Sequence, residues 1–278
     1  MLPTPMASSR TSKISRVSRS KRPADATYVY CVTKGTRAPK LTRGPKGLVG
    51  TGAPRLLDVG DGYHVVVASA PLALYAGEKI DERLRDIDWV GERATEHEAV
   101  VEHVLASSTV VPMKLFTLFD SDDRARAHVE KLKKSLDRVV ARIEGCDEWG
   151  LRVLFDETEA ARVIAANART ARPTSGTGFL ERKKTLGDAQ RKLTTRAAGQ
   201  ADELYALAAE VARRATRRSA PSGELAARVM LDAVFLVPRT EVRRLQRAVG
   251  PIAERLAAEG FHVTLSGPWP AYSFIGAR

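Results

Sequence analysis

The two cysteines are the first candidates for chemistry, because thiols can form disulfides or bind metal ions. Cys31 and Cys146 lie far apart, with no CxxC spacing and no histidine close to either in the sequence. This usage is typical of a reducing compartment and argues against both a disulfide framework and a zinc site. We expect two small, buried, apolar side chains instead.

Other titratable residues could serve as general acids, bases or ligands. His97 falls on the apolar stripe of a predicted helix and has no cluster of partner residues around it in the sequence, so a buried histidine with a hydrogen-bond partner is the favoured interpretation. The acid pairs Asp122-Asp123 and Asp147-Glu148 fall at predicted helix caps and turns. At such positions carboxylates complement helix dipoles rather than perform acid–base catalysis.

No nucleotide-binding or hydrolase motif accompanies these residues. The chain contains no GxxxxGK[ST], HExxH, CxxC or GxSxG segment, and no GxGxxG lies between a strand and a helix. The Gly176-Thr177-Gly178 segment is too short to cradle a phosphate. We therefore expect a protein that is not an enzyme, with no catalytic residue, cofactor, metal ion or small-molecule substrate.

Positive charge is concentrated in two places in a chain whose net charge is +12. Residues 1–24 carry lysines and arginines but no acid, and we predict a disordered basic tail over residues 1–26. The second place is the start of the long helix predicted at about 179–218. A solvated face is favoured there, because the acids Glu181 and Asp188 are interleaved and Phe179 is the single aromatic. Nucleic-acid binding by the tail and this helix together stays the alternative function. This candidate basic surface consists of Arg182, Lys183, Lys184, Arg191 and Lys192.

Length and hydrophobicity are ordinary for a soluble protein of two modest domains. The chain has 278 residues, of which 44% are hydrophobic, and no apolar run approaches the roughly 20 residues of a membrane span. We therefore expect no membrane partner.

The first domain is predicted at 27–146. Strands are expected at 28–33, 55–59 and 63–69, the last two forming a hairpin, followed by a helix from Trp89 capped by Asp88. A strand segment at 109–119, with Pro112 at an edge or at a strand start, and an amphipathic helix capped by Ser121 or Asp122 complete it. This order predicts an α/β sandwich of ferredoxin-like type.

The second domain is predicted at 147–278. Strands are expected at 148–155, 228–237 and 261–265, and a helix that is kinked or restarted at Pro251 precedes the last strand. A long helix, or a helical hairpin broken near Gly199, covers about 179–218. The fold class is therefore α+β with two domains, the second a ferredoxin-like variant with a long helical insertion.

The last segment, 266–274, is here named the terminal strap. Its prolines restrict the backbone and its aromatics favour burial, so it should fold back as a stiff, extended element. It could be a rigid contact for a partner, or a structural lock with Trp269 and Phe274 packed on the second domain, and the lock is favoured. The residues concerned are Gly267, Pro268, Trp269, Pro270, Tyr272 and Phe274.

Several segments taken together resemble the gas vesicle protein family GvpF/GvpL. They span residues 28 to 274, and the terminal strap is the most specific of them. The matching stretches are Tyr28-Val29-Tyr30, Trp89 to Val100, Val111-Pro112 with Phe116-Thr117, Glu148-Trp149-Gly150, Gly178-Phe179-Leu180 with Lys183, and Gly267 to Phe274.

The resemblance implies a non-enzymatic accessory or minor structural protein of gas vesicle assembly, with two α+β domains. Its implied partners are the small apolar shell protein and other accessory gas vesicle proteins, and its implied location is the cytoplasm, in association with the gas vesicle. The chain departs from the family pattern at Phe116, where the family typically has a glycine before the threonine.

Overall fold

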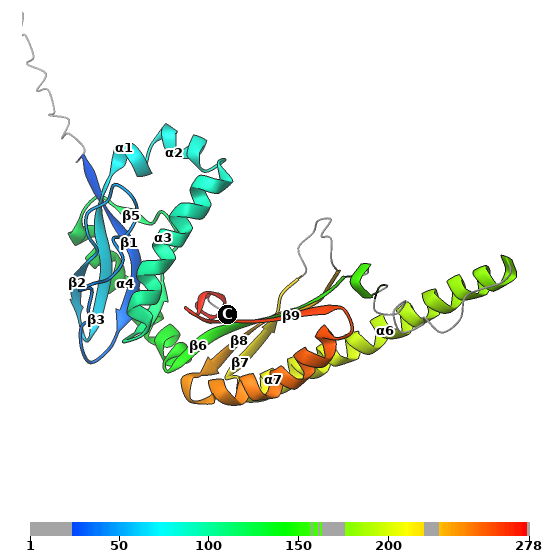
Figure 1. Cartoon of the computed structure of the whole chain (residues 1–278). Coiled ribbons are helices and arrows are strands. Elements are labelled where there is room, and N and C mark those ends of the chain that lie inside the picture. The colour runs from blue at the N-terminus through cyan, green and yellow to red at the C-terminus, as the bar shows by residue number, and fades with distance from the viewer. Residues whose placement is uncertain (1–23, 157, 161, 163–175, 220–227, 277–278) are drawn as a thin grey trace, which may run out of the picture.

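The computed structural model describes residues 24–276 except 157, 161, 163–175 and 220–227 (Figure 1). Two antiparallel sheets, each packed against helices, confirm the mixed α and β architecture, whereas the ferredoxin-like details are not confirmed. The predicted basic tail lies almost wholly outside the described residues. Its last two residues, Asp25 and Ala26, belong to the first strand instead.

The first sheet has the strand order β2-β3-β1-β4, and β5 also pairs with β1. The predicted hairpin is confirmed, since β2 and β3 pair across a turn at Asp61 and Gly62. Side chains of β1 and β3 are buried on both faces of the sheet. The strands are β1 (Asp25–Lys34), β2 (Arg55–Gly60), β3 (Tyr63–Pro71), β4 (Thr109–Pro112) and β5 (Leu118–Phe119).

Helices cover both faces of this sheet, which explains its apolar strands. Helix α3 (Ile87–Leu105) packs on the face that carries Tyr28 and Tyr30, and α4 (Asp122–Ile143) packs on the other face. The short helices α1 (Leu72–Tyr75) and α2 (Glu78–Arg83) connect β3 to α3.

Helix α3 begins earlier than the prediction, because Asp86 and not Asp88 is its N-cap. The Asp86 carboxylate accepts hydrogen bonds from the amides of Asp88 and Trp89, both at 3.1 Å. For α4 the expected cap Ser121 is confirmed, with its hydroxyl accepting from the Arg124 amide at 3.3 Å.

The strand predicted at 109–119 is interrupted. Between β4 and β5 the chain turns, and Phe116 adopts the left-handed φ of 62°. Pro112 has no N–H to donate and ends β4, at the edge of the sheet as expected.

The second sheet has the order β7-β8-β6-β9. Helices α6 (Gly176–Val211) and α7 (Val242–Ala257) cover one of its faces (Figure 1). The strands are β6 (Cys146–Phe155), β7 (Arg214–Arg217), β8 (Arg228–Pro238) and β9 (Phe261–Trp269), and two short 3₁₀ helices are η1 (Arg239–Glu241) and η2 (Tyr272–Phe274).

The helical predictions for this half of the chain are confirmed in part. Helix α6 is one long helix, the first of the two predicted alternatives, and not a hairpin broken near Gly199; Ala197, Ala201 and Leu204 pack into the core on both sides of that glycine. It ends at Val211 rather than near 218. Helix α7 passes through Pro251 without a restart, held by an apolar stripe on the sheet.

One half of the chain contains the first sheet with α1 to α4, and the other half contains the second sheet with α6 and α7. The two halves share an apolar core. Val140 and Ile143 of α4 lie in the same buried cluster as Val234 and Leu236, which are on the face of β8 opposite to α6. The terminal strap contributes Phe274 to this cluster, and Figure 1 shows η2, drawn in red, lying between the two sheets.

Candidate functional site

The terminal strap begins as a continuation of β9. Strand β9 is longer than the predicted 261–265, because pairing with β6 extends until Trp269 lies opposite Glu148. Gly267 has a φ of 139°, and a Cβ there would lie 2.9 Å from both the Glu148 carbonyl oxygen and the Trp149 ring. Only glycine fits this close approach. The next peptide, to Pro268, is cis.

The aromatic residues of the strap have different environments. Phe274 is 5% exposed and packs against α4 and β8, and Pro270 is also buried. Trp269 is 41% exposed and Tyr272 is 40% exposed. Trp269 is thus only partly buried, and its role as a lock on the second domain stays a prediction, whereas Phe274 is buried in the core between the two halves.

Polar contacts fix the strap to both halves. The Tyr272 hydroxyl donates to Glu98 Oε2 on α3 at 2.5 Å. The Ser273 amide donates to Glu148 Oε2 on β6 at 2.7 Å, and Arg142 of α4 donates to the Phe274 carbonyl at 2.9 Å. The strap therefore connects the two halves rather than closing the second half alone.

Glu148 is a residue whose role the sequence reasoning missed. It lies inside β6, not at a turn, and its buried side chain also accepts hydrogen bonds from Arg218 (3.0 Å) and the Ser273 hydroxyl (2.8 Å). Asp147, its neighbour, pairs with Arg239 at 3.0 Å, and Arg239 also donates to the Leu105 carbonyl of α3. The alternation that buries Trp149 places Glu148 on the opposite face of the strand, so the sequence pattern gave no signal of this burial.

Aromatic packing positions α3 against the first sheet. The Tyr28 hydroxyl and His97 Nδ1 are 2.7 Å apart, and Tyr28 also accepts a hydrogen bond from the Phe116 amide at 3.3 Å. The ring of Trp89 stacks on that of Phe116, with centroids 5.4 Å apart. The expected buried His97 with a hydrogen-bond partner is thus confirmed.

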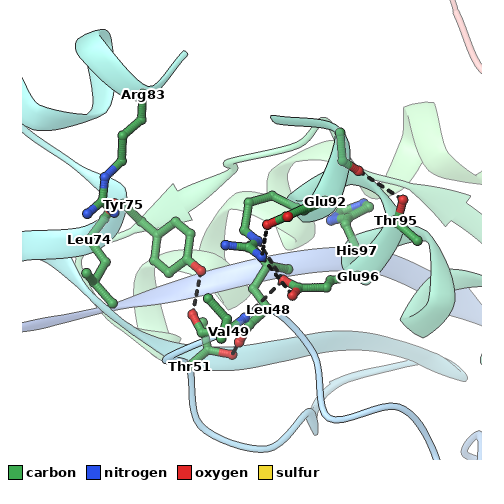
Figure 2. A network of polar contacts seen from close by, with 12 residues as sticks. Leu48, Val49, Thr51, Leu74, Tyr75, Arg83, Glu92, Thr95, Glu96 and His97 are labelled. Carbon is green, nitrogen blue, oxygen red and sulfur yellow. Dashed lines mark hydrogen bonds and ion pairs between the residues drawn. The ribbon is translucent and has the colours of Figure 1, made fainter. Parts of the chain in front are cut away.

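A polar network holds the outer side of α3 (Figure 2). The Val49 amide donates to Glu96 Oε2 at 3.0 Å, and the Tyr75 hydroxyl donates to the Val49 carbonyl. Arg93, which is buried, pairs with Glu96 at 2.8 Å. Loop, short helix and α3 are therefore fixed relative to one another, which leaves the opposite side of α3 to face the strap.

Burial sets the protonation of the α3 side chains. Desolvation lowers the pKa of His97 to about 4, so the ring is neutral at physiological pH. Desolvation also raises the pKa of Glu98, opposed by the hydrogen bond from Tyr272.

Two hollows are each lined by residues of both α3 and the terminal strap. The first, the Trp269 hollow, has a volume of about 560 Å³ and is lined by residues that include Trp269, Pro268, Leu105, Glu102 and Arg239. The second, the His97 groove, has a volume of about 400 Å³ and a mostly apolar wall. Its lining includes Ala94, His97, Glu98, Met113, Leu115 and Tyr272.

The candidate basic surface lies on α6, away from the strap. Arg182 and Lys183 belong to this helix, but their side chains are outside the described part of the structure. Lys184, Arg191 and Lys192 are exposed, and Arg191 pairs with Asp188 at 2.7 Å. The surface and the strap are thus separate features.

One group among the described residues could hold a metal ion: Asp156, Glu159 and His262, whose ligating atoms lie within 4.8 Å of one another. Asp156 already accepts the amides of Thr158 and Glu159, and His262 pairs with Glu159 at 3.1 Å. A helix cap and an ion pair account for this proximity.

Both cysteines are free and buried, and burial raises the pKa of each thiol. Within the described part of the chain, no helix is both long and apolar enough to cross a membrane.

Known proteins resemble this chain in sequence and in structure. Two relatives match by sequence: gas vesicle protein L from Streptomyces sp. (strain CB03234), 28% identical over 252 residues, and gas vesicle protein L2 from Halobacterium salinarum (strain ATCC 700922 / JCM 11081 / NRC-1), 27% identical over 271 residues. Each match covers 90% of this chain, and 92% and 91% of the relatives.

Two crystal structures share the fold. GvpF from Anabaena sp. PCC7120 matches with a TM-score of 0.64 at 15% identity, covering 91% of this chain and 97% of that one. GvpF from Microcystis aeruginosa matches with a TM-score of 0.62 at 13% identity, covering 91% and 99%.

The family described as gas vesicle synthesis protein GvpL/GvpF matches residues 26–276, which include both sheets and the terminal strap. The chain therefore belongs to the GvpL/GvpF family of gas vesicle proteins.

Proposed function

We propose that the chain is a non-enzymatic accessory or minor structural protein of gas vesicle assembly. In this role it binds the small apolar shell protein and other gas vesicle proteins in the cytoplasm, at the gas vesicle. Family membership over residues 26–276 and two relatives named as gas vesicle proteins support a role in the gas vesicle.

The observation that carries the binding role is a pair of exposed aromatic side chains on a fixed backbone. Trp269 and Tyr272 are each about two-fifths exposed, although the strap around them is anchored to α3, α4 and β6. Aromatic residues on pre-ordered segments are effective contacts, because little conformational entropy is lost on binding.

Nucleic-acid binding has less support. The arginines that follow α6 are engaged within the protein, Arg217 with Asp202 at 2.7 Å and Arg218 with Glu148 at 3.0 Å. Phosphate contacts would therefore compete with existing ion pairs there.

Deletion and complementation test the proposed role. Cells that lack the gene are expected to lose gas vesicles, measured by electron microscopy and buoyancy, and to regain them with the full chain. Normal gas vesicles in the deletion strain would contradict a role in assembly.

A further inference from the structure

A polar hollow lies where α4, β7 and the terminal strap meet, and it is here named the arginine hollow. Its volume is about 430 Å³. Its polar side chains are Arg142 of α4, Arg214 and Thr216 of β7, and Ser273 of the strap. None of the described residues that line it is acidic.

The alternation of β7 explains how side chains of the second sheet reach this hollow. Ala215 packs against the core that includes α6, and the Arg217 guanidinium lies over the Tyr205 ring of α6, 4.3 Å from its centroid. Successive side chains of a strand point to opposite faces. Arg214 and Thr216 therefore point away from α6 and line the hollow, on the face where α4 and the strap pack.

The hydrogen-bond donors of the hollow are only partly used. The side chains of Arg214 and Thr216 make no hydrogen bond or ion pair with any described residue. Arg142 uses Nη1 for the carbonyl oxygens of Phe274 (2.9 Å) and Gly276 (3.1 Å), which leaves its Nε and Nη2 without a described partner. The hollow therefore offers several donors from two guanidinium groups and a hydroxyl.

The charges around the hollow are mostly positive. Arg213 donates to the carbonyl oxygens of Arg142 (2.8 Å) and Glu144 (2.9 Å), which holds a third guanidinium group at the end of α4. Glu144 is exposed and does not line the hollow, and Glu148 already pairs with Arg218 at 3.0 Å. An anion in the hollow would therefore reduce repulsion between like charges.

We propose that the arginine hollow binds a small oxyanion of the phosphate class, with Arg142 on one side and Arg214 and Thr216 on the other. Guanidinium N–H groups match the oxygen geometry of phosphate, and the volume suits inorganic phosphate or a small phosphate monoester. The bound anion would connect α4 of the first half to β7 of the second half. This site is separate from the exposed aromatic pair Trp269 and Tyr272, so it does not depend on the proposed function.

Removal of one unpaired arginine tests the inference. Arg214 is exposed and its side chain supports no other described residue, so Arg214→Gln should leave the fold intact. Arg243→Gln is the matched control, because Arg243 is an exposed arginine of α7 whose side chain also has no described partner, and its loss changes the net charge equally. The full-length proteins are titrated calorimetrically with inorganic phosphate and with glycerol phosphate, at an ionic strength held constant with sodium chloride.

We expect saturable binding to wild type and to Arg243→Gln, with a melting temperature raised by about 3 °C at a phosphate concentration tenfold above Kd. Arg214→Gln should weaken binding at least tenfold and remove this rise. Thr216→Val, which removes the hydroxyl from an exposed strand position, should weaken binding at least threefold and keeps the test valid if Arg214→Gln misfolds. Tighter binding of glycerol phosphate would identify a monoester as the ligand, and tighter binding of inorganic phosphate would identify the free ion.

Three results would overturn the assignment of the arginine hollow. They are equal affinity of wild type and Arg214→Gln, an equal loss of affinity in Arg243→Gln, and heats of binding that appear with single-stranded DNA but with neither phosphate compound. Capture of the shell protein is measured separately, so each of these results leaves the proposed function standing.

Discussion

The hydroxyl of Tyr272 donates to Glu98 Oε2 across 174 positions of sequence, and this contact joins the terminal strap to α3. The next residues of the strap are fixed as well, because the Ser273 amide donates to Glu148 of β6 and Arg142 of α4 donates to the Phe274 carbonyl. The terminal strap therefore connects the two halves, while Trp269 at its start stays 41% exposed.

Gly267→Ala should destabilise the fold by about 2–3 kcal/mol, because the added Cβ would lie 2.9 Å from the Glu148 carbonyl oxygen and at a φ of 139°. Gly199→Ala is the control: it adds a methyl group where nothing lies within 4 Å, inside α6. Helix propensity predicts a gain of up to about 1 kcal/mol there. Urea unfolding measures both, and equal effects of the two changes would refute this account of the strap.

Phe116 gives a test of backbone strain. Both Phe116→Gly and Phe116→Ala lose the stacking on Trp89, but only glycine relieves the left-handed φ of 62°. We therefore expect the glycine variant to be more stable than the alanine variant by about 1 kcal/mol in urea unfolding. An alanine variant as stable as the glycine variant would show that Phe116 is not strained in solution.

His97 should make the fold sensitive to acid. Its folded pKa of about 4 lies below the ordinary value of 6.5, so the unfolded chain binds the proton first and stability falls as pH decreases from 6.5 towards 4. The full loss attributable to His97 is about 3 kcal/mol. We expect His97→Gln to lose less stability than wild type over this range, in urea titrations at fixed pH values.

Glu98 acts in the opposite direction, because its raised pKa makes protonation favour the folded state as pH falls. Glu98 is present in wild type and in His97→Gln, so its contribution to the pH dependence cancels when the two proteins are compared. Identical pH profiles for wild type and His97→Gln would contradict a buried neutral His97.

Trp269 and Phe274 should respond differently to truncation. Phe274→Ala creates a cavity in the core between the halves and should cost about 3–5 kcal/mol. Trp269→Ala removes a side chain that is 41% exposed, so we expect a loss below about 1.5 kcal/mol but weaker capture of the shell protein. A large fall in melting temperature for Trp269→Ala, with capture unchanged, would restore the lock as its main role.

Sequence patterns predicted the regular elements well where periodicity reflects burial. The alternation from Trp149 to Phe155 gave a strand of the second sheet, and the spacing from Ala125 to Ile143 gave α4. The first and last residues of the helices and strands were less predictable, since they depend on tertiary contacts. Arg214–Arg217 continues the chain after α6 as a strand because β8 supplies hydrogen-bond partners, and a helical period carries no information about that.

For the candidate site, composition indicated the strap but not what it touches. Proline and glycine chemistry predicted its stiffness from local rules. The partners Glu98 and Glu148 come from two distant elements, α3 and β6, and their proximity is a property of the assembled fold. The different exposure of Phe274, which lies in the buried cluster, and of Trp269, which is 41% exposed, is likewise a property of the assembled fold.

Affinity capture of the full-length chain after co-expression with the gas vesicle shell protein tests the central claim most directly. The account predicts that the shell protein is retained with wild type and identified by mass spectrometry. Absence of the shell protein and of every other gas vesicle protein from the captured material, while circular dichroism shows the chain to be folded, would contradict it.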